Sequence, residues 1–311
     1  MILNVSFFMN KAFILHANEK YFDIIYTAIL SIKQYSNLPI YVYLINSDKK
    51  IDINGVTTIK WDLNLKNKGN NYIQDGNNFY INRSSSEIYN ILIQKPLVTK
   101  HALENFADVV AYIDSDSIAT PYVENIFNYY DESKSYPYFG EGIYDYLHYN
   151  GRGGAMDPND LSTTLEQPVS ELFKLNQYNR VGKRYRQTGY FITGKNSIEF
   201  LEEWYWMLNH PTILKNPAYY APYHEETILN PLLWDRNFYN GLPLVYLNGT
   251  LETIDEVYNN LGFTGVSREI RSWLKLPSNK EELLFFHGEK NIEVRNRMIT
   301  KIKQLYETRT I

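Results

Sequence analysis

Short, uninterrupted runs of hydrophobic residues are the feature that most limits the folds open to this chain. Residues 11–17 (KAFILHA) and 108–114 (DVVAYID) place apolar side chains in succession, without the alternation of a strand that has one face in water. Such runs are typical of strands buried on both faces of a parallel sheet. Residues 39–46 and 56–62 predict two further strands, and residues 21–35 have helical spacing. The opening therefore reads β-α-β-β, which favours an α/β fold with a Rossmann-like mixed sheet flanked by helices.

The remainder of the chain alternates shorter strands and helices. Two polar stretches, residues 63–86 and 141–183, are expected to be irregular and to include functional loops. We predict a single domain over residues 1–290, followed by a helical tail over residues 291–311. The other expected helices cover 86–106 (interrupted by Pro96), 120–130, 197–209 and 225–234, and the other expected strands cover 136–140, 184–194, 242–248 and 281–288.

Charge and cysteine content exclude several kinds of site and partner. The 31 basic and 35 acidic residues are well mixed and leave a net charge of −4, so no nucleic-acid partner is expected. Without cysteine there is neither a disulfide nor a thiolate metal site. No apolar run approaches the roughly 20 residues that span a bilayer, and the first residues lack a signal-peptide pattern, so we expect a soluble, cytoplasmic protein. We interpret the basic tail as a solvated helix, with peripheral membrane contact as the alternative.

Asp114 and Asp116 follow the apolar run 109–113 directly. In an extended segment, side chains two residues apart point to the same face, with Ser115 turned away between them. The carboxyl end of a central strand is where open α/β sheets bind ligands. Carboxylate oxygens suit Mn²⁺ or Mg²⁺, so we expect a divalent cation here. The alternative is that the two acids only mark a turn after the strand.

A β-α-β opening followed by a strand, Asp-x-Asp and a helix resembles the GT-A fold of nucleotide-sugar glycosyltransferases. Further motifs most resemble glycosyltransferase family eight, the glycogenin-like and bacterial galactosyltransferase-like retaining enzymes. The segment HANEKYF (16–22) resembles the family's Ala-Asp-x-x-Tyr stretch, which binds uracil. Ala17 and Tyr21 keep their places, whereas Asn18 replaces the acid. An amide can still pair with uracil, because it carries both a donor and an acceptor; the alternative for Asn18 is a helix N-cap.

Two further segments resemble the family's surroundings of the donor phosphates and sugar. The family has an Arg on the helix before the Asp-x-Asp strand; here Lys95 is the closer match by spacing, and Lys100 is the other candidate. Either could instead be a surface residue. The segment RQTGYFITG (186–194) resembles the family's Asn-x-Gly strand, with Gln187 and Gly189 near the matching places. An ordinary strand with a bulge is the alternative.

The segment HEETILN (224–230) resembles the Asp-Gln and Asp-Ile-Leu-Asn residues that open a family helix. The resemblance implies that Glu225 binds the donor sugar and that Glu226 faces the anomeric carbon. Alternatively, both acids only satisfy the helix dipole.

The segment FFHGEK (285–290) resembles the family's His-x-x-Gly-x-x-Lys with compressed spacing. It implies that His287 completes the metal site, while Gly288 and Lys290 lie at the diphosphate; a core histidine is the alternative. Ser115, inside the Asp-x-Asp motif, is a further donor-binding candidate. Arg184 and Arg186 are weaker candidates for neutralising phosphate charge.

The resemblance implies metal-dependent transfer of a sugar from a nucleoside diphosphate sugar, expected to be a UDP-sugar, with retention of configuration. The acceptor would be a hydroxyl of a glycan, a lipid-linked sugar or a protein. Three alternatives stay open: an inverting enzyme in which Glu225 or Glu226 is the base, a sugar-1-phosphate nucleotidyltransferase, and a non-catalytic sugar-binding protein on the same scaffold. The nucleotidyltransferase is disfavoured, because residues 16–22 contain no glycine.

Overall fold

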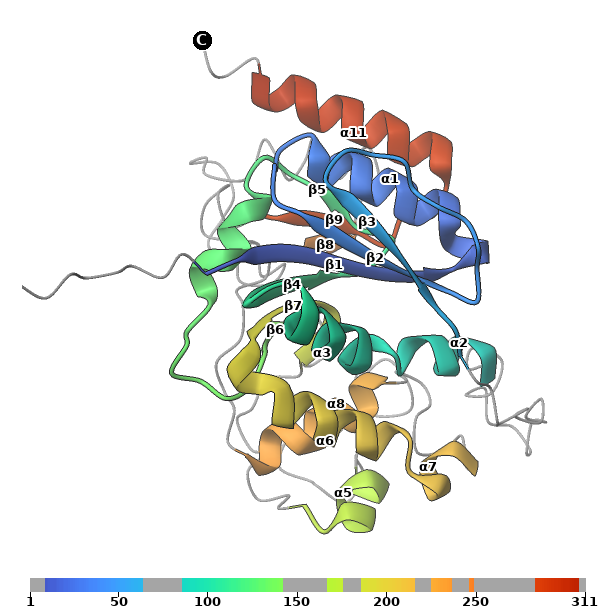
Figure 1. Ribbon diagram of the computed structural model, residues 1–311, viewed down its shortest axis with the longest axis vertical. Helices are drawn as coiled ribbons and strands as arrows, with labels where there is room; N and C mark the ends of the chain where they lie inside the picture. Colours follow the sequence, from blue (N-terminus) through green and yellow to red (C-terminus); the bar gives the residue numbers. More distant parts are fainter. Residues whose placement is uncertain are drawn as a thin grey trace, which may run out of the picture.

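A six-stranded mixed sheet in the order β3-β2-β1-β4-β7-β6 forms the centre of the molecule (Figure 1). The computed structural model describes residues 9–63, 86–141, 167–175, 186–215, 225–236, 246–248 and 283–307. Strands β1, β2, β3 and β4 are mutually parallel, whereas β7 is antiparallel to β4 and β6 is antiparallel to β7. The strands are β1 Lys11–Asn18, β2 Ile40–Ile45, β3 Val56–Trp61, β4 Val109–Ile113, β6 Tyr138–Glu141 and β7 Arg186–Gly194.

Helices cover both faces of this sheet (Figure 1). Helices α1 and α11 lie on one side, and α3, α6 and α8 lie on the other. The helices are α1 Phe22–Lys33, α2 Ser86–Leu92, α3 Lys95–Asn105, α5 Gln167–Phe173, α6 Ile198–Leu208, α7 Pro211–Lys215, α8 Glu225–Asp235 and α11 Ile292–Glu307, with 3₁₀ segments at Glu19–Tyr21, Val123–Tyr129 and Lys195–Ser197. The predicted α/β class with helices on both sheet faces is confirmed.

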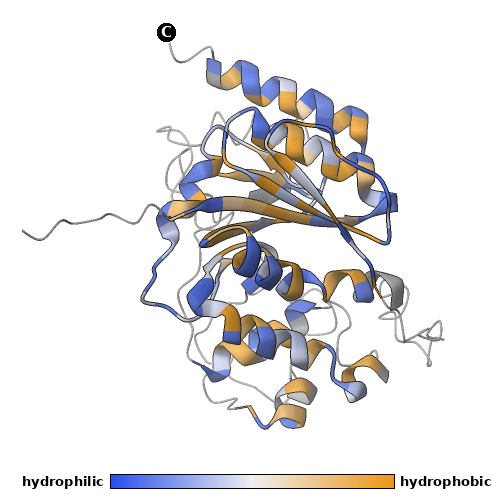
Figure 2. Ribbon diagram, in the orientation of Figure 1, coloured by the Kyte–Doolittle hydropathy of each residue, from blue (hydrophilic) through white to orange (hydrophobic). Residues whose placement is uncertain are grey.

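Burial of the sheet under helices on both of its faces explains the uninterrupted hydrophobic runs. Along β1, Phe13 and Leu15 belong to the core under α1, whereas Ala12 and Ile14 belong to the core under α3 and α6. Because successive strand side chains point to opposite faces, both sets must be apolar. Figure 2 shows hydrophobic residues along the central strands and a mostly hydrophilic outer surface on α11.

A second, three-stranded sheet brings the C-terminal region back to β4. It consists of β5 Ile118–Ala119, β9 Phe285–His287 and β8 Tyr246–Asn248 in the order β5-β9-β8. Ile118 pairs with Phe286, so the residues after β4 lie beside the residues that end β9. This pairing joins two parts of the candidate site that are far apart in the sequence.

Several local expectations are wrong or incomplete. The helix expected over residues 120–130 is a shorter 3₁₀ helix over Val123–Tyr129. The break between α2 and α3 precedes Pro96, which lies in the first turn of α3, where its missing N–H costs no helical bond. Helix α5 lies within residues 141–183, which we expected to be irregular. Residues 64–85, most of the other expected loop, are outside the described residues.

The C-terminal segment also differs from the expected solvated helix. Met298 and Ile302 on α11 pack against Ile118, Leu283 and Phe286, and all are buried. One face of α11 is therefore part of the core. Within the described parts of the chain, no helix has the length and apolar character needed to cross a membrane.

Candidate active site

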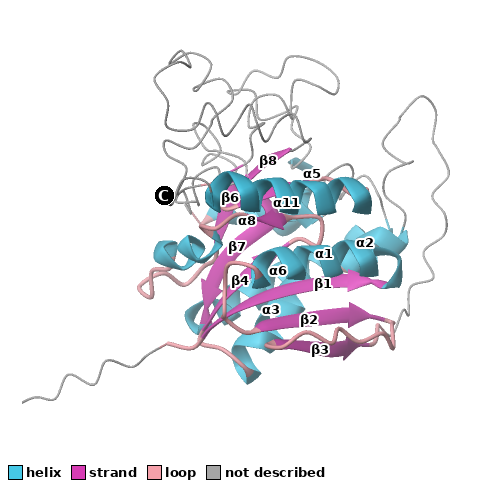
Figure 3. Cartoon of the chain, turned by 90° about the horizontal axis from the view of Figure 1, so that it is seen from above, coloured by secondary structure: helices cyan, strands magenta, loops and turns pink. Residues whose placement is uncertain are grey.

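Strands β1, β2 and β3 point in the same direction (Figure 3). The candidate site lies at the carboxyl ends of the parallel strands. Strand β1 is parallel to both neighbours, β2 on one side and β4 on the other. The chain leaves β1 toward β2 and β3 and later returns to the opposite side as β4. Such a switch point opens a crevice between the connections, where α/β sheets bind ligands.

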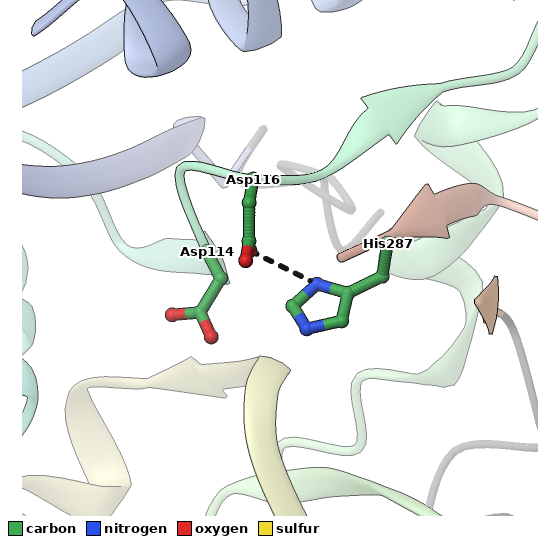
Figure 4. Close-up of side chains that lie close together, drawn as sticks. All are labelled: Asp114, Asp116 and His287. Carbon is green, nitrogen blue, oxygen red and sulfur yellow. Dashed lines mark ion pairs between the residues drawn. The ribbon is translucent and has the colours of Figure 1, made fainter. Parts of the chain in front are cut away.

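Asp114, Asp116 and His287 converge at this edge (Figure 4). One ligand atom from each lies within 4.8 Å of the others, and Asp116 Oδ1 is 3.2 Å from His287 Nδ1. The expected extended geometry is wrong, because Ser117 N donates to Asp114 O at 3.1 Å and closes a turn. This turn, together with the pairing of β5 with β9, brings the three side chains together.

The donor set fits a divalent cation. Two carboxylates and an imidazole can bind Mn²⁺. Gly189 on β7 keeps space open beside them, since a Cβ there would lie 3.4 Å from Asp114 Oδ2 and 3.6 Å from His287 Cε1.

Lys95 links the acidic group to the start of α8. Its side chain is 2% exposed, and Nζ lies 3.1 Å from Asp114 Oδ1 and 2.6 Å from Glu225 Oε1. Nζ also donates to Thr188 Oγ1 at 3.0 Å and to Thr188 O at 3.2 Å. Burial lowers the pKa of Lys95, but Asp114 and Glu225 outweigh burial and the net shift is upward. Lys95 is therefore a permanent positive charge between two carboxylates.

Glu225 and Glu226 occupy the first turn of α8 and meet β7 at Thr188. Thr188 Oγ1 is 2.6 Å from Glu225 Oε1, and Thr188 N donates to Glu226 Oε1 at 3.0 Å. Glu225 is buried, while Glu226 is partly exposed. Both acids satisfy the helix dipole, yet Glu225 also pairs with Lys95.

Two residues that the sequence analysis missed, Tyr112 and His16, form a chain of hydrogen-bonding contacts that ends at Asp114. Tyr112 lies two residues earlier on β4, and its hydroxyl is 2.8 Å from Asp114 Oδ1 and 2.8 Å from His16 Nδ1. His16 Nε2 donates to Ile91 O at 3.0 Å. Burial, and then the charge of Lys95, lower the pKa of His16 to about 4. Burial raises the pKa of Asp114, with Lys95 opposing and Asp116 adding to the shift. The sequence signal for Tyr112 was its position two residues before Asp114, because side chains two residues apart along a strand point to the same face.

A cavity of about 420 Å³ lies at the ends of β1 and β2 and is lined in part by Ile91, the residue whose carbonyl His16 contacts. Asn18 lines it, and Asn18 Oδ1 is buried with no hydrogen-bond partner among the described residues. Asn18 occupies the N-cap position of the 3₁₀ turn at Glu19–Tyr21, as the alternative expected, but its side chain makes no capping hydrogen bond. The remaining lining residues are Glu19, Lys20, Ile45, Asn46, Leu63, Asn90 and Ile91.

Tyr21 and Lys290 lie next to each other across this edge. Lys290 Nζ is 5.5 Å from the centre of the Tyr21 ring, which is cation–π distance. Partial burial lowers the pKa of Lys290, whereas the Tyr21 hydroxyl, Asp116 and Asp114 raise it by more, so the net shift is upward. The compressed motif thus still brings a lysine within electrostatic range of the acidic pair.

The other predicted residues fall into two groups. Ala17 is buried on β1, Gln187 Oε1 lies beside Gly189, Gly288 N donates to Asp116 O at 3.3 Å, and Ser115 O accepts from Arg295. The last three lie at the site, whereas the Ala17 side chain belongs to the hydrophobic core beside α1. Lys100 instead pairs with Glu104 and Glu202 on the helical surface. The main chain of Arg186 bonds to Asn230, and Arg184 is outside the described residues.

Comparison with solved structures identifies the fold. The chain is similar to the galactosyltransferase LgtC in complex with donor and acceptor sugar analogs, with a TM-score of 0.53, 9% identity, and coverage of 96% of this chain and 95% of LgtC. An active-site mutant of LgtC gives a TM-score of 0.54 at 10% identity, with the same coverage. The bifunctional glycosyltransferase WbbM gives 0.53 at 14% identity, over 99% of this chain and 53% of WbbM.

The fold is therefore the GT-A type. No known family model matches the sequence, and no curated protein matches it. At these identities the likeness establishes the fold, and the chemistry must be argued from the site itself.

Proposed function

We propose that this protein is a glycosyltransferase that moves a sugar from a nucleoside diphosphate sugar, most simply a UDP-sugar, to an acceptor hydroxyl. The observation that carries the proposal is the convergence of Asp114, Asp116 and His287 at the β1/β4 switch point of a GT-A fold. The motif order further supports membership of glycosyltransferase family eight and therefore retention of configuration.

Three features of the site suit the three parts of such a donor. The cavity beside Asn18 suits the base, because Asn18 Oδ1, which has no hydrogen-bond partner in the described part of the chain, can accept the imide N–H of uracil. Asp114, Asp116 and His287 would hold Mn²⁺ or Mg²⁺ at the diphosphate, with Lys290 near them. Glu225 and Glu226, beyond Lys95, would face the sugar.

Charge is the central problem of the reaction, because breaking the glycosidic bond leaves a diphosphate anion. A bound Mn²⁺ or Mg²⁺ would supply a Lewis acid for that leaving group. Lys290 adds a positive charge on the same side, and its raised pKa keeps it protonated at neutral pH.

On the sugar side, the transition state has oxocarbenium character, which a nearby carboxylate stabilises. Glu226 is our candidate for that role, because it is the more exposed of the two acids and Thr188 N holds its Oε1. Glu225, held by Lys95 and Thr188, would orient Glu226 and bind sugar hydroxyls. The acceptor would be a hydroxyl of a glycan, a lipid-linked sugar or a protein.

The proposal is tested by incubating the protein with a panel of nucleotide sugars and Mn²⁺ and measuring release of the nucleoside diphosphate. Asp116→Asn should abolish release, whereas Asp52→Asn, on the exposed loop after β2, should leave it unchanged. Glu226→Gln should bind the donor but turn it over slowly. NMR of the product distinguishes retention from inversion.

Other products would identify other functions. Pyrophosphate release from a nucleoside triphosphate and a sugar 1-phosphate would make the protein a nucleotidyltransferase. Binding of nucleotide sugars without turnover in any combination would make it a sugar-binding protein. Full activity of Asp116→Asn in the presence of a chelator would remove the metal from the mechanism.

A further inference from the structure

Arg295 on α11 is a fully buried cation whose hydrogen bonds go to the two loops that carry Asp116 and His287. Its exposure is 0%. Nη1 donates to Asp116 O at 2.8 Å and to Glu289 O at 2.7 Å. Nη2 donates to Ser117 O at 2.9 Å and to Ser115 O at 3.3 Å. One guanidinium thus binds the main chain on both sides of the candidate metal site.

The same side chain also anchors both loops to α1. Nε donates to Thr27 Oγ1 at 2.5 Å, and Nη2 donates to Ile24 O at 3.2 Å. Among the described residues, every acceptor of Arg295 except the Thr27 hydroxyl is a main-chain carbonyl. The two loops also meet through the pairing of β5 with β9, through Gly288 N, which donates to Asp116 O at 3.3 Å, and through Ser117 Oγ, which lies 3.3 Å from His287 Nδ1. Arg295 adds hydrogen bonds from a single side chain to three segments that are distant in the sequence.

Arg295 has no carboxylate hydrogen-bond partner among the residues that the structure describes, and such a buried arginine is a costly way to stabilise a fold. Burial lowers the pKa of Arg295 to about 10, with Asp116 and Glu289 opposing, so it stays charged at neutral pH. An apolar side chain could fill the same place at lower cost, as Met298 and Ile302 do elsewhere on α11. The benefit must lie in geometry, since the planar group offers five donors in fixed directions.

That geometry acts on the Asp116 and His287 side chains. Arg295 binds the carbonyls of residues 115–117, and the Asp116 carboxylate of the same loop points toward His287 (Figure 4). The bond of Arg295 to Glu289 O fixes the turn directly after His287.

We propose that Arg295 is a positioning residue for the divalent cation: it holds the Asp116 and His287 loops at the separation and orientation that the ion requires. This inference rests on the proposed metal site. Loss of a group that orients metal ligands typically weakens metal affinity by about 10- to 100-fold. We expect a change of that size in Mn²⁺ affinity when the guanidinium is lost.

The test measures Mn²⁺ affinity of the folded protein from the electron paramagnetic resonance signal of free Mn²⁺, without any donor sugar. Arg295→Met should weaken Mn²⁺ binding roughly 10- to 100-fold. Arg295→Lys should restore part of the loss, because lysine keeps the positive charge but lacks the planar set of guanidinium donors. Arg297→Met is the matched control: it removes the same charge from the exposed face of α11 and should leave the affinity unchanged.

A merely structural role would lower the melting temperature without Mn²⁺ but leave the Mn²⁺ affinity of the folded protein unchanged, and that result would overturn the inference. If Arg295→Met does not fold, Thr27→Val removes one anchor of the guanidinium and keeps its charge. A several-fold loss of affinity in Thr27→Val would then support the inference, and no loss would overturn it. Absence of Mn²⁺ binding by the wild type would remove both the metal site and this role, while the nucleotide-sugar assay would still decide the transfer reaction.

Discussion

Replacing Lys95 with methionine should destabilise the protein strongly at neutral pH and weakly in acid. Methionine nearly matches the length of the side chain but leaves Asp114 and Glu225 without their shared counter-charge. At an effective dielectric constant of about 20, the attraction of Lys95 Nζ to Glu225 Oε1 at 2.6 Å and to Asp114 Oδ1 at 3.1 Å is roughly 5–6 kcal/mol for each pair. Desolvation offsets much of this attraction, and removing one partner of a buried pair typically costs about 3–5 kcal/mol. We expect a loss in that range at pH 8.

The pH dependence separates this electrostatic loss from a packing defect. Without Lys95, the pKa values of Asp114 and Glu225 in the folded variant lie above those of the unfolded chain. The folded variant then binds more protons than the unfolded chain, so its stability falls as pH rises through that interval. Toward pH 4 the carboxyls are neutral in the folded state, and the difference from wild type should shrink.

Urea unfolding at several pH values measures the effect. Lys100→Met is the control on the same helix, since Lys100 pairs with the surface acids Glu104 and Glu202, and it should cost less than about 1 kcal/mol. Lys95→Met combined with Glu225→Gln should recover part of the loss, because one uncompensated charge is removed. A loss for Lys95→Met that is equal at pH 5 and pH 8, with no recovery in the double variant, would refute the electrostatic reasoning.

Three further outcomes are expected. Gly189→Ala should weaken Mn²⁺ binding by roughly tenfold or more while barely changing the melting temperature, because its Cβ enters the space beside Asp114 at ordinary van der Waals distance; calorimetric titration with Mn²⁺ measures this. Tyr112→Phe should cost about 1–3 kcal/mol in urea unfolding, because it removes the hydroxyl shared with His16 and Asp114. Neutral His16 should contribute stability that is complete above pH 6.5 and is lost as pH falls toward 4, about 3 kcal/mol in total, because the unfolded chain binds the proton more tightly. His16→Gln should flatten the acid side of the stability curve, and an unchanged slope would contradict the assignment.

The residues close to the strand ends were the most predictable part of the site. Asp114 and Asp116 were found because a buried strand ends where they begin, and the carboxyl edge of such a strand is a general place for ligands. Their exact arrangement was not predictable, since a turn replaces the extended geometry after Ile113. Local patterns indicate where a strand ends but not how the chain turns next.

The choice between Lys95 and Lys100 shows a second limit. Five residues along an α-helix correspond to about 140° of rotation, so the two lysines face different sides of α3. Only packing against the sheet decides that Lys95 faces the acids and that Lys100 faces α6. Matching by spacing favoured Lys95, but the charges that surround it come from β4 and α8.

Arg295 was missed for a related reason. In the sequence it is one basic residue among several in a polar, helix-like tail. Nothing nearby distinguishes it from the exposed Arg297, because its acceptors, apart from Glu289 O, lie 178 to 180 residues away after β4 and 268 to 271 residues away on α1. Burial of a charge depends on which elements surround it, and those elements are remote in the chain.

The sequence by itself determined the class of fold and the edge of the sheet where a ligand would bind, because both follow from short-range periodicity. Hydrophobic runs identify strands covered on two faces, and helical spacing identifies the elements that cover them. Only the tertiary structure decided which polar side chains meet at that edge. Pairing of β5 with β9 and packing of α11 on α1 bring His287 and Arg295 to Asp116, since hydrogen bonds and charges act over a few ångströms, whatever the distance along the chain.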